Sequence, residues 1–149
     1  MNRLVIRHGE YDEKHPDIET AWGPPLTDEA LATARVLGGQ MRLKGIEIGT
    51  AAVSEQLRAQ QTALALGANI LKVYPALNEV MLTEEEKDML LRNVVPSHVR
   101  ERGREILANP PAERTIVSHG GTLAGLFFEL GLQVERFLPV HLEVREVDF

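Results

Sequence analysis

The strongest constraint on the fold is the alternation of two kinds of sequence segment. Short apolar runs rich in β-branched residues alternate with stretches of helical spacing along the whole chain. The first run is Leu4-Val5-Ile6, and others fall at residues 46–53, 70–74, 115–117 and 140–147. Runs of this length and composition are typical of buried strands. Strands separated by helices usually pair in parallel, so we predict an α/β fold with helices on both faces of a mainly parallel sheet.

The stretches between these runs carry signals for helix starts. Thr27, Ser54 and Thr83 are candidate N-caps, because each precedes a stretch of helical spacing. Glu86 follows Thr83 by three residues, which is the spacing of a capping box. The helix that Ser54 is expected to cap ends near Gly67. Two more helices are predicted, over residues 99–108 and 122–130.

Composition excludes several classes of function. The 149 residues include no cysteine, which removes disulfides, zinc–thiolate sites and thiol nucleophiles. The formal charge of −6, from 16 Lys+Arg against 22 Asp+Glu, disfavours a general nucleic-acid binder. No apolar stretch is long enough to span a membrane, and the run between Arg3 and Arg7 is too short for a secretory signal. We therefore expect a single cytoplasmic domain over residues 1–149, without a nucleic-acid or membrane partner.

Two histidines each follow a predicted strand directly. Arg7-His8-Gly9 comes after the first strand, and Ser118-His119-Gly120-Gly121 comes after the strand at 115–117. Ligands of parallel α/β sheets bind beyond the carboxyl ends of the strands. If the two strands are neighbours, both imidazoles meet in one crevice. Taken singly, each histidine is explained as well by a polar residue that ends a strand.

Arg58 supplies the third part of the pattern. It lies four residues after Ser54 on the same face of the predicted helix, and helical side chains lean toward the N-terminus. This aims Arg58 at the edge that holds His8 and His119, although a lone arginine there would be read as a surface residue. Guanidinium groups match phosphoryl oxygens, and neutral imidazole is a nucleophile. With Arg7 and a protonated His119, the set predicts phosphoryl transfer without a metal ion.

A metal site is the alternative for the same residues. His8, Glu10 and His119 could act as ligands, but no second pair of ligands at short spacing supports them. Arg7 and Arg58 would also repel a cation. We therefore expect neither a metal ion nor another cofactor.

Four motifs occur in order along the chain. They are Arg7-His8-Gly9-Glu10, Pro25-Leu26-Thr27, Ser54-x-x-x-Arg58-Ala59-x-Gln61-Thr62-Ala63 and Val117-Ser118-His119-Gly120-Gly121. Together they resemble the histidine phosphatase superfamily, the phosphoglycerate mutase-like group of branch 1. The resemblance implies a three-layer α/β/α sandwich, with His8 accepting a phosphoryl group that Arg7, Arg58 and His119 bind. Lys14 stands where many members have an asparagine, and Ala30 where a glycine is usual, which bears on the substrate class.

The resemblance also implies a carboxylic acid between the Arg58 helix and His119. Glu79 matches that position, directly after a strand and a proline, and we expect it to be partly buried and to protonate the leaving group. The rival carboxyl groups lie just beyond it and are better explained as the solvated first turn of a helix. These rivals are Glu84, Glu85 and Glu86.

Three functions are compatible with the resemblance. The first is a metal-independent phosphatase that hydrolyses a phosphomonoester or phosphohistidine through a covalent phosphohistidine on His8. The second is a phosphoglycerate mutase-type phosphotransferase, and the third is a non-catalytic phosphate- or phosphoprotein-binding module. The chain has no long insertion to enclose a small diacid, which favours hydrolysis over a mutase. All five expected residues are present, so we expect an enzyme acting on a phosphorylated small molecule or phosphoprotein.

Overall fold

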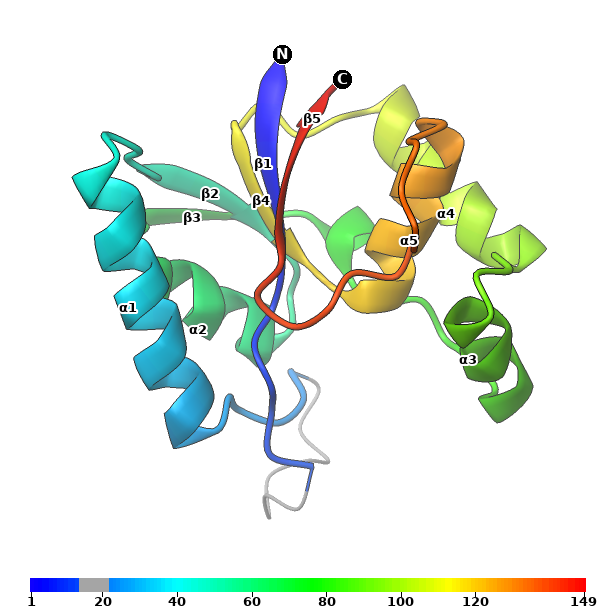
Figure 1. The fold of residues 1–149 in the computed structure, drawn as a ribbon, viewed down its shortest axis with the longest axis horizontal. Helices are drawn as coiled ribbons and strands as arrows, with labels where there is room; N and C mark the ends of the chain where they lie inside the picture. The colour runs from blue at the N-terminus through cyan, green and yellow to red at the C-terminus, as the bar shows by residue number, and fades with distance from the viewer. Residues whose placement is uncertain (14–21) are drawn as a thin grey trace.

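The computed structural model describes residues 1–13 and 22–149, and in those residues it forms five strands, five α-helices and a 3₁₀ turn. Figure 1 shows the sheet in the middle of the molecule with helices on either side. The elements in chain order are β1 (Asn2–Arg7), α1 (Asp28–Leu43), β2 (Thr50–Val53), α2 (Leu57–Leu66), β3 (Ile70–Val73), η1 (Pro75–Leu77), α3 (Glu84–Leu91), α4 (Ser97–Ala108), β4 (Thr115–Ser118), α5 (Gly120–Glu129) and β5 (Val144–Asp148).

The strands lie in the order β3-β2-β4-β1-β5. The first four run parallel, and β5 pairs with β1 in the antiparallel direction. The termini consequently lie side by side at one end of the sheet (Figure 1). The predicted mainly parallel α/β sheet is confirmed, with an antiparallel strand added at one edge.

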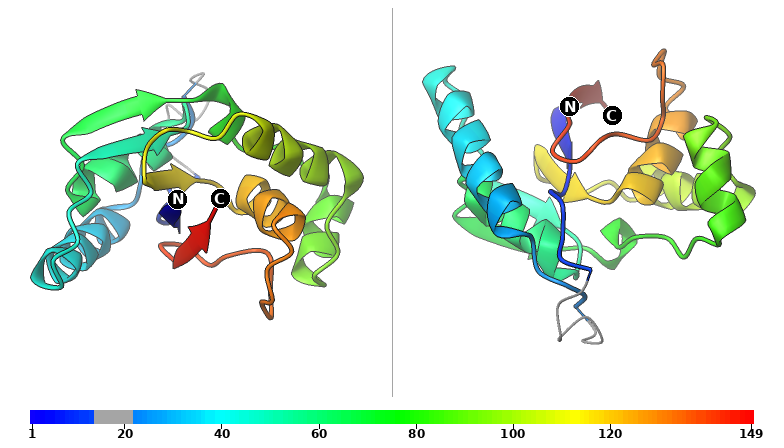
Figure 2. Two further views of the ribbon diagram at one scale, coloured as in Figure 1. Left: turned by 90° about the horizontal axis from the view of Figure 1, so that it is seen from above. Right: turned by 60° about the horizontal axis from the view of Figure 1, so that its bottom comes forward.

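Two core clusters lie between the sheet and its helices. The view from above shows α1 and α2 on one face of the sheet and α4 and α5 on the other (Figure 2). Leu4 and Ile6 of β1 pack with residues of α1 and α2, while Val5 between them packs with residues of α4 and α5. Successive side chains of a strand point to opposite faces, so a strand covered by helices on both sides is apolar throughout. This confirms the three-layer α/β/α sandwich.

The predicted helix starts at Thr27 and Thr83 are confirmed. The hydroxyl of Thr27 accepts a hydrogen bond from the Ala30 amide at 3.1 Å. Thr83 and Glu86 form the complete capping box of α3. Both starts depend on residues close together in sequence, which is why the local pattern located them.

Two strands begin later in the sequence than predicted. β2 begins at Thr50 rather than at residue 46, after Gly49 in the left-handed region with φ of 60°. β5 begins at Val144 rather than at residue 140. The residues before it form a turn in which the Leu142 amide donates to the Arg7 carbonyl at 3.0 Å. Contacts with the end of β1 therefore replace sheet pairing in this segment.

In the described parts of the chain, no helix combines the length and the apolar character needed to cross a membrane.

Candidate active site

His8 and His119 lie at the same edge of the sheet. β1 and β4 are parallel neighbours in which Arg7 pairs with Ser118, so the residue after each strand arrives at the same level. The centroids of the two imidazole rings are 4.9 Å apart. β2 is the other neighbour of β4, and the first turn of α2 brings Arg58 to this edge. The predicted meeting of His8, Arg58 and His119 is confirmed.

The hydrogen bonds of His8 fix which ring nitrogen carries the proton. Its Nδ1 lies 2.6 Å from the Gly9 carbonyl oxygen, which can only accept, so Nδ1 carries the proton. Nε2 is left with a lone pair and accepts a hydrogen bond from Arg58 Nε at 3.3 Å. Gly9 is itself held in place, because its amide donates to the Thr62 hydroxyl of α2 at 3.1 Å.

The surroundings of His8 keep its ring neutral. The side chain is 2% exposed. Burial first, and then the positive charges of Arg58 and Arg7, lower the pKa of His8 from 6.5 to about 3, against a smaller opposing effect of the Gly9 hydrogen bond. At neutral pH the Nε2 lone pair is therefore free, which is the state that a nucleophilic imidazole needs.

Arg7 and Arg58 place two guanidinium groups around His8. Arg7 Nη1 donates to the Pro139 carbonyl at 2.7 Å, whereas its buried Nε has no partner among the described residues. Arg58 is 8% exposed, and its guanidinium lies 4.7 Å from the centre of the Tyr11 ring. Burial lowers the pKa of both arginines, but a guanidinium remains charged in proteins. The site is therefore positive within an acidic protein.

His119 is fully buried, and its ring is neutral rather than protonated as we expected. Burial lowers its pKa well below 6.5, and His8, Arg58 and Arg7 lower it further. Its Nε2 lies 2.8 Å from the Ser54 hydroxyl, while its Nδ1 has no partner among the described residues. The predicted positive charge on this second histidine is therefore disfavoured in the ligand-free protein, first by its burial and then by the charges around it.

The prediction that Ser54 caps α2 is also wrong. The helix begins at Leu57 with Gln56 as its N-cap residue. The Leu57 amide donates instead to the Trp22 carbonyl at 2.7 Å, a contact between segments far apart in sequence. The Trp22 side chain itself is 53% exposed.

Glu79 lies next to the first turn of α5. Its carboxylate oxygens accept hydrogen bonds from the amides of Gly121 at 3.1 Å, Thr122 at 2.9 Å and Val80 at 3.0 Å. The Thr122 hydroxyl, 3.2 Å from the carboxyl group, donates its proton to the Asn78 carbonyl at 2.7 Å instead. Three amide donors, two of them in the first turn of α5, thus hold the Glu79 carboxyl group in place. Its charge acts on both Arg7 and Arg58, which places Glu79 at the edge of the site.

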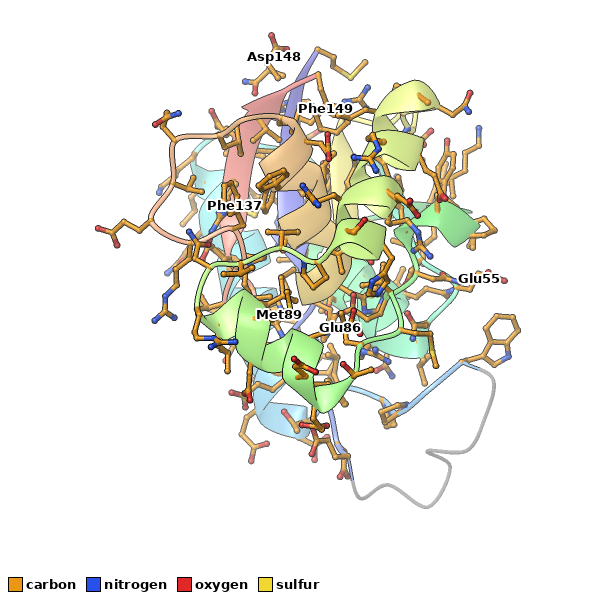
Figure 3. The ribbon with its side chains drawn as sticks, turned by 90° about the vertical axis from the view of Figure 1, so that its right-hand side faces the viewer. Glu55, Glu86, Met89, Phe137, Asp148 and Phe149 are labelled. Atoms are coloured by element: carbon orange, nitrogen blue, oxygen red, sulfur yellow. The ribbon has the colours of Figure 1, made fainter. Side chains whose placement is uncertain are left out.

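The rival carboxyl groups lie elsewhere, on α3. Figure 3 shows this helix, with Glu86 labelled, outside the layer that α4 and α5 form. Glu86 completes the capping box and faces His98, and Glu84 pairs with Lys87 at 3.0 Å. Together with Glu85 they form the first turn of α3, as we expected.

Two further side chains border His8 that the sequence did not single out as site residues. Tyr11 stands edge-on to the imidazole, with ring centroids 5.6 Å apart. His141, which we placed in the last strand, lies in the turn before β5 with its ring 5.4 Å from that of His8. Its Nδ1 is 3.1 Å from the His8 carbonyl. Only its position just before an edge strand could have hinted at this contact.

Two further interpretations of the sequence concern Lys14 and a possible metal site. Lys14, where many relatives have an asparagine, lies outside the described residues. Within the described ranges, no three His, Asp or Glu side chains form a group that could hold a metal ion. The charged groups around His8 are guanidinium groups, which attract an anion.

Comparison with known proteins decides the family. The family description "Histidine phosphatase superfamily (branch 1)" matches residues 4–94, more than half of the chain. The chain belongs to the histidine phosphatase superfamily. The matched region includes Arg7, His8, Arg58 and Glu79, and β4 brings His119 to them.

Relatives within the superfamily carry different names. A 2,3-bisphosphoglycerate-dependent phosphoglycerate mutase of Xanthobacter autotrophicus is 28% identical over 85 residues, covering 56% of this chain and 41% of that protein. The chain spans less than half the length of the curated relatives it matches. The crystal structure of a phosphoglycerate mutase from Thermus thermophilus superposes with a TM-score of 0.69 at 27% identity, covering 100% of this chain and 94% of the other.

A second solved structure shares the fold. The protein histidine phosphatase SixA, in complex with tungstate, superposes with a TM-score of 0.60 at 20% identity, covering 99% of this chain and 88% of the other. The superfamily fold thus occurs in proteins named as mutases and as phosphatases.

Proposed function

We propose that this protein is a phosphatase that hydrolyses a phosphomonoester or a phosphohistidine through a covalent phosphohistidine on His8. The observation that carries the proposal is the state of His8. The ring is neutral, its Nδ1 proton is held by the Gly9 carbonyl, and its Nε2 lone pair lies among guanidinium groups. This combination suits a nucleophile that attacks a bound phosphoryl group.

In the first step, His8 Nε2 attacks phosphorus and the bond from phosphorus to the leaving atom breaks. The leaving atom keeps the electron pair and takes a proton delivered by Glu79 in its protonated form. Arg7, Arg58 and His119 bind the equatorial oxygens, where charge is spread in the transition state. The His8 ring keeps its Nδ1 proton throughout, because the Gly9 carbonyl accepts it.

In the second step, water attacks the phosphoryl group on His8. The P–N bond breaks, its electrons return to Nε2, and the Glu79 carboxylate takes the proton that water loses. Both residues thereby regain their starting states. Three amide donors hold the Glu79 carboxyl group in place for both proton transfers. A phosphohistidine would need the least help from Glu79, since its imidazole departs more readily than an alkoxide.

A mutase is the second candidate, and the names of the curated relatives favour it. His141, whose ring lies 5.4 Å from that of His8, also lines a cavity of about 240 Å³ together with Glu10 and Glu29. These two acidic side chains disfavour a diacid such as a phosphoglycerate in that cavity, which favours hydrolysis. A non-catalytic binding module would require no free nucleophile, which His8 provides.

The test is product analysis with three substrates: p-nitrophenyl phosphate, a phosphohistidine peptide and a phosphoglycerate. We expect inorganic phosphate from the first two, with the same rate in the presence of EDTA. Isomerised phosphoglycerate without free phosphate would establish the mutase. Phosphate binding without turnover of any substrate would establish the binding module.

A further inference from the structure

Ser54 is a buried hydroxyl that lies against His119. The side chain is 0% exposed and stands between the end of β2 and the start of α2. Among the described residues its Oγ has two hydrogen-bond partners. These are the Gln56 amide, which donates at 3.2 Å, and His119 Nε2, at 2.8 Å.

The number of protons decides the direction of the bond between Ser54 and His119. A serine hydroxyl has one proton to donate, and the Gln56 amide can only donate to it. His119 Nε2 is then the one acceptor available for the Ser54 proton. If Nε2–H donated instead, the buried Ser54 proton would have no acceptor, which costs about 1–3 kcal/mol. The hydroxyl therefore donates, and a neutral His119 carries its proton on Nδ1.

Nδ1 of His119 is buried and has no partner among the described residues, and the same is true of Nε of Arg7. Arg7 pairs with Ser118 across β1 and β4, and His119 follows Ser118 directly, so Arg7 and His119 lie next to each other at this edge of the sheet. Two buried donors without acceptors at one place are unusual in a folded protein and point to an absent acceptor. Oxygens of a phosphoryl group would accept from both.

We propose that Ser54 is a positioning residue: it fixes the tautomer of His119 so that Nδ1–H donates to a phosphoryl oxygen. The donation from Nδ1–H to a phosphoryl oxygen rests on the proposed function, whereas the assignment of the His119 tautomer does not. In the other tautomer, Nδ1 would present a lone pair to that oxygen, and the two would repel each other. A neutral histidine can thus serve as a donor only while the Ser54 hydroxyl holds its other nitrogen.

The tautomer can be measured directly with ¹⁵N-labelled histidine by NMR. We expect Nδ1 of His119 to be protonated in the wild-type protein and in Ser54→Thr, which keeps the hydroxyl. Ser54→Ala should show a mixture of tautomers or the Nε2–H form. Ser118→Ala is the matched control, because it removes a buried hydroxyl beside His119 that bonds to the Leu77 carbonyl instead. It should keep the Nδ1–H tautomer.

Binding of orthovanadate tests whether Nδ1–H of His119 donates to a phosphoryl oxygen. Ser54→Ala should bind orthovanadate about 10- to 100-fold more weakly than wild type, the scale for losing one hydrogen bond to a charged group. Ser54→Thr should restore binding. An Nε2–H tautomer in wild-type His119 overturns the proposal, whatever the enzyme does. So does a Ser54→Ala variant with wild-type tautomer and affinity. If the Nδ1–H tautomer is present in wild type and lost in Ser54→Ala but the wild-type protein binds no orthovanadate, the role of Ser54 in fixing the tautomer is confirmed and the proposed function is overturned.

Discussion

At the scale of single residues, the geometry of Arg58 matters as much as its charge. Its Nε donates to His8 Nε2, the atom that we propose as the nucleophile, and its guanidinium packs on Tyr11. Lysine would keep the charge but lose the planar fork. We expect Arg58→Lys to lower kcat/KM by about 100-fold, the scale for one lost donor to a transition-state oxygen. Steady-state kinetics with p-nitrophenyl phosphate measure this. Arg104→Lys, on the exposed face of α4 where Arg104 pairs with Glu129, should not change kcat/KM; equal effects of the two would remove Arg58 from the site.

The role of Glu79 is tested by the leaving group. If Glu79 delivers the proton, Glu79→Gln should slow cleavage of an alkyl phosphate far more than cleavage of p-nitrophenyl phosphate, whose phenolate leaves without help. General acid catalysis contributes about 10²- to 10⁴-fold, so the ratio of the two losses is measurable by product release. Glu86→Gln is the matched control, since Glu86 belongs to the capping box of α3. Equal losses on both substrates in Glu79→Gln would mean that Glu79 only shapes the site.

The sequence predicted those site residues whose positions follow from strand order and local spacing. Arg7, His8 and His119 follow parallel strands, and a parallel sheet aligns the ends of its strands. The contacts of Ser54 and His141 were not predictable in this way. They join segments 65 and 133 positions apart, and nothing in the local sequence encodes such pairings.

At the scale of elements, the adjacent glycines of α1, Gly38 and Gly39, have different surroundings, so alanine is expected to have opposite effects on stability at the two positions. A Cβ on Gly38 would run into the backbone carbonyl of Leu66, where α1 crosses the end of α2. Gly39 has only the end of the Arg42 side chain nearby, at 3.8 Å. We expect Gly38→Ala to destabilise the protein by about 1–3 kcal/mol and Gly39→Ala to stabilise it by about 0.5–1 kcal/mol. Urea unfolding measures both. A stabilising Gly38→Ala would contradict the close packing of α1 on α2.

The same pair shows what helix patterns can and cannot reveal. From sequence, Gly38 and Gly39 both weaken a predicted helix. Only the packed structure shows that Gly38 permits two backbones to touch. The starts of β2 and β5 were missed for a related reason. Apolar residues of 46–48 and 140–142 continue the strand pattern, but their backbones turn to meet other segments.

For the molecule as a whole, the buried histidines make stability depend on pH. The pKa of His8 is lowered to about 3 in the folded protein, so below about pH 6.5 the unfolded chain binds a proton that the folded protein does not. The stability is complete above pH 6.5 and is lost as pH falls toward 3. His119 and His141 have pKa values shifted in the same direction.

Urea unfolding of wild type and His8→Gln should reveal this linkage. Between pH 7 and pH 5, the free energy of unfolding should fall by about 2 kcal/mol more in wild type than in His8→Gln. His8→Gln keeps every carboxyl group, so the difference between the two proteins in the fall of the free energy of unfolding reports the titration of His8. Equal losses in the two proteins would mean that His8 titrates normally in the folded state.

We propose that His8 carries the phosphoryl group during turnover. The most direct test is to stop the reaction with p-nitrophenyl phosphate in alkali, digest the protein and locate the phosphoryl group by mass spectrometry. We expect one phosphoryl group on His8, stable in alkali, lost in acid and absent from His8→Gln, which should also lack turnover. A phosphoryl group on His119 or His141, or a His8→Gln variant that still releases p-nitrophenol at the wild-type rate, would contradict the claim.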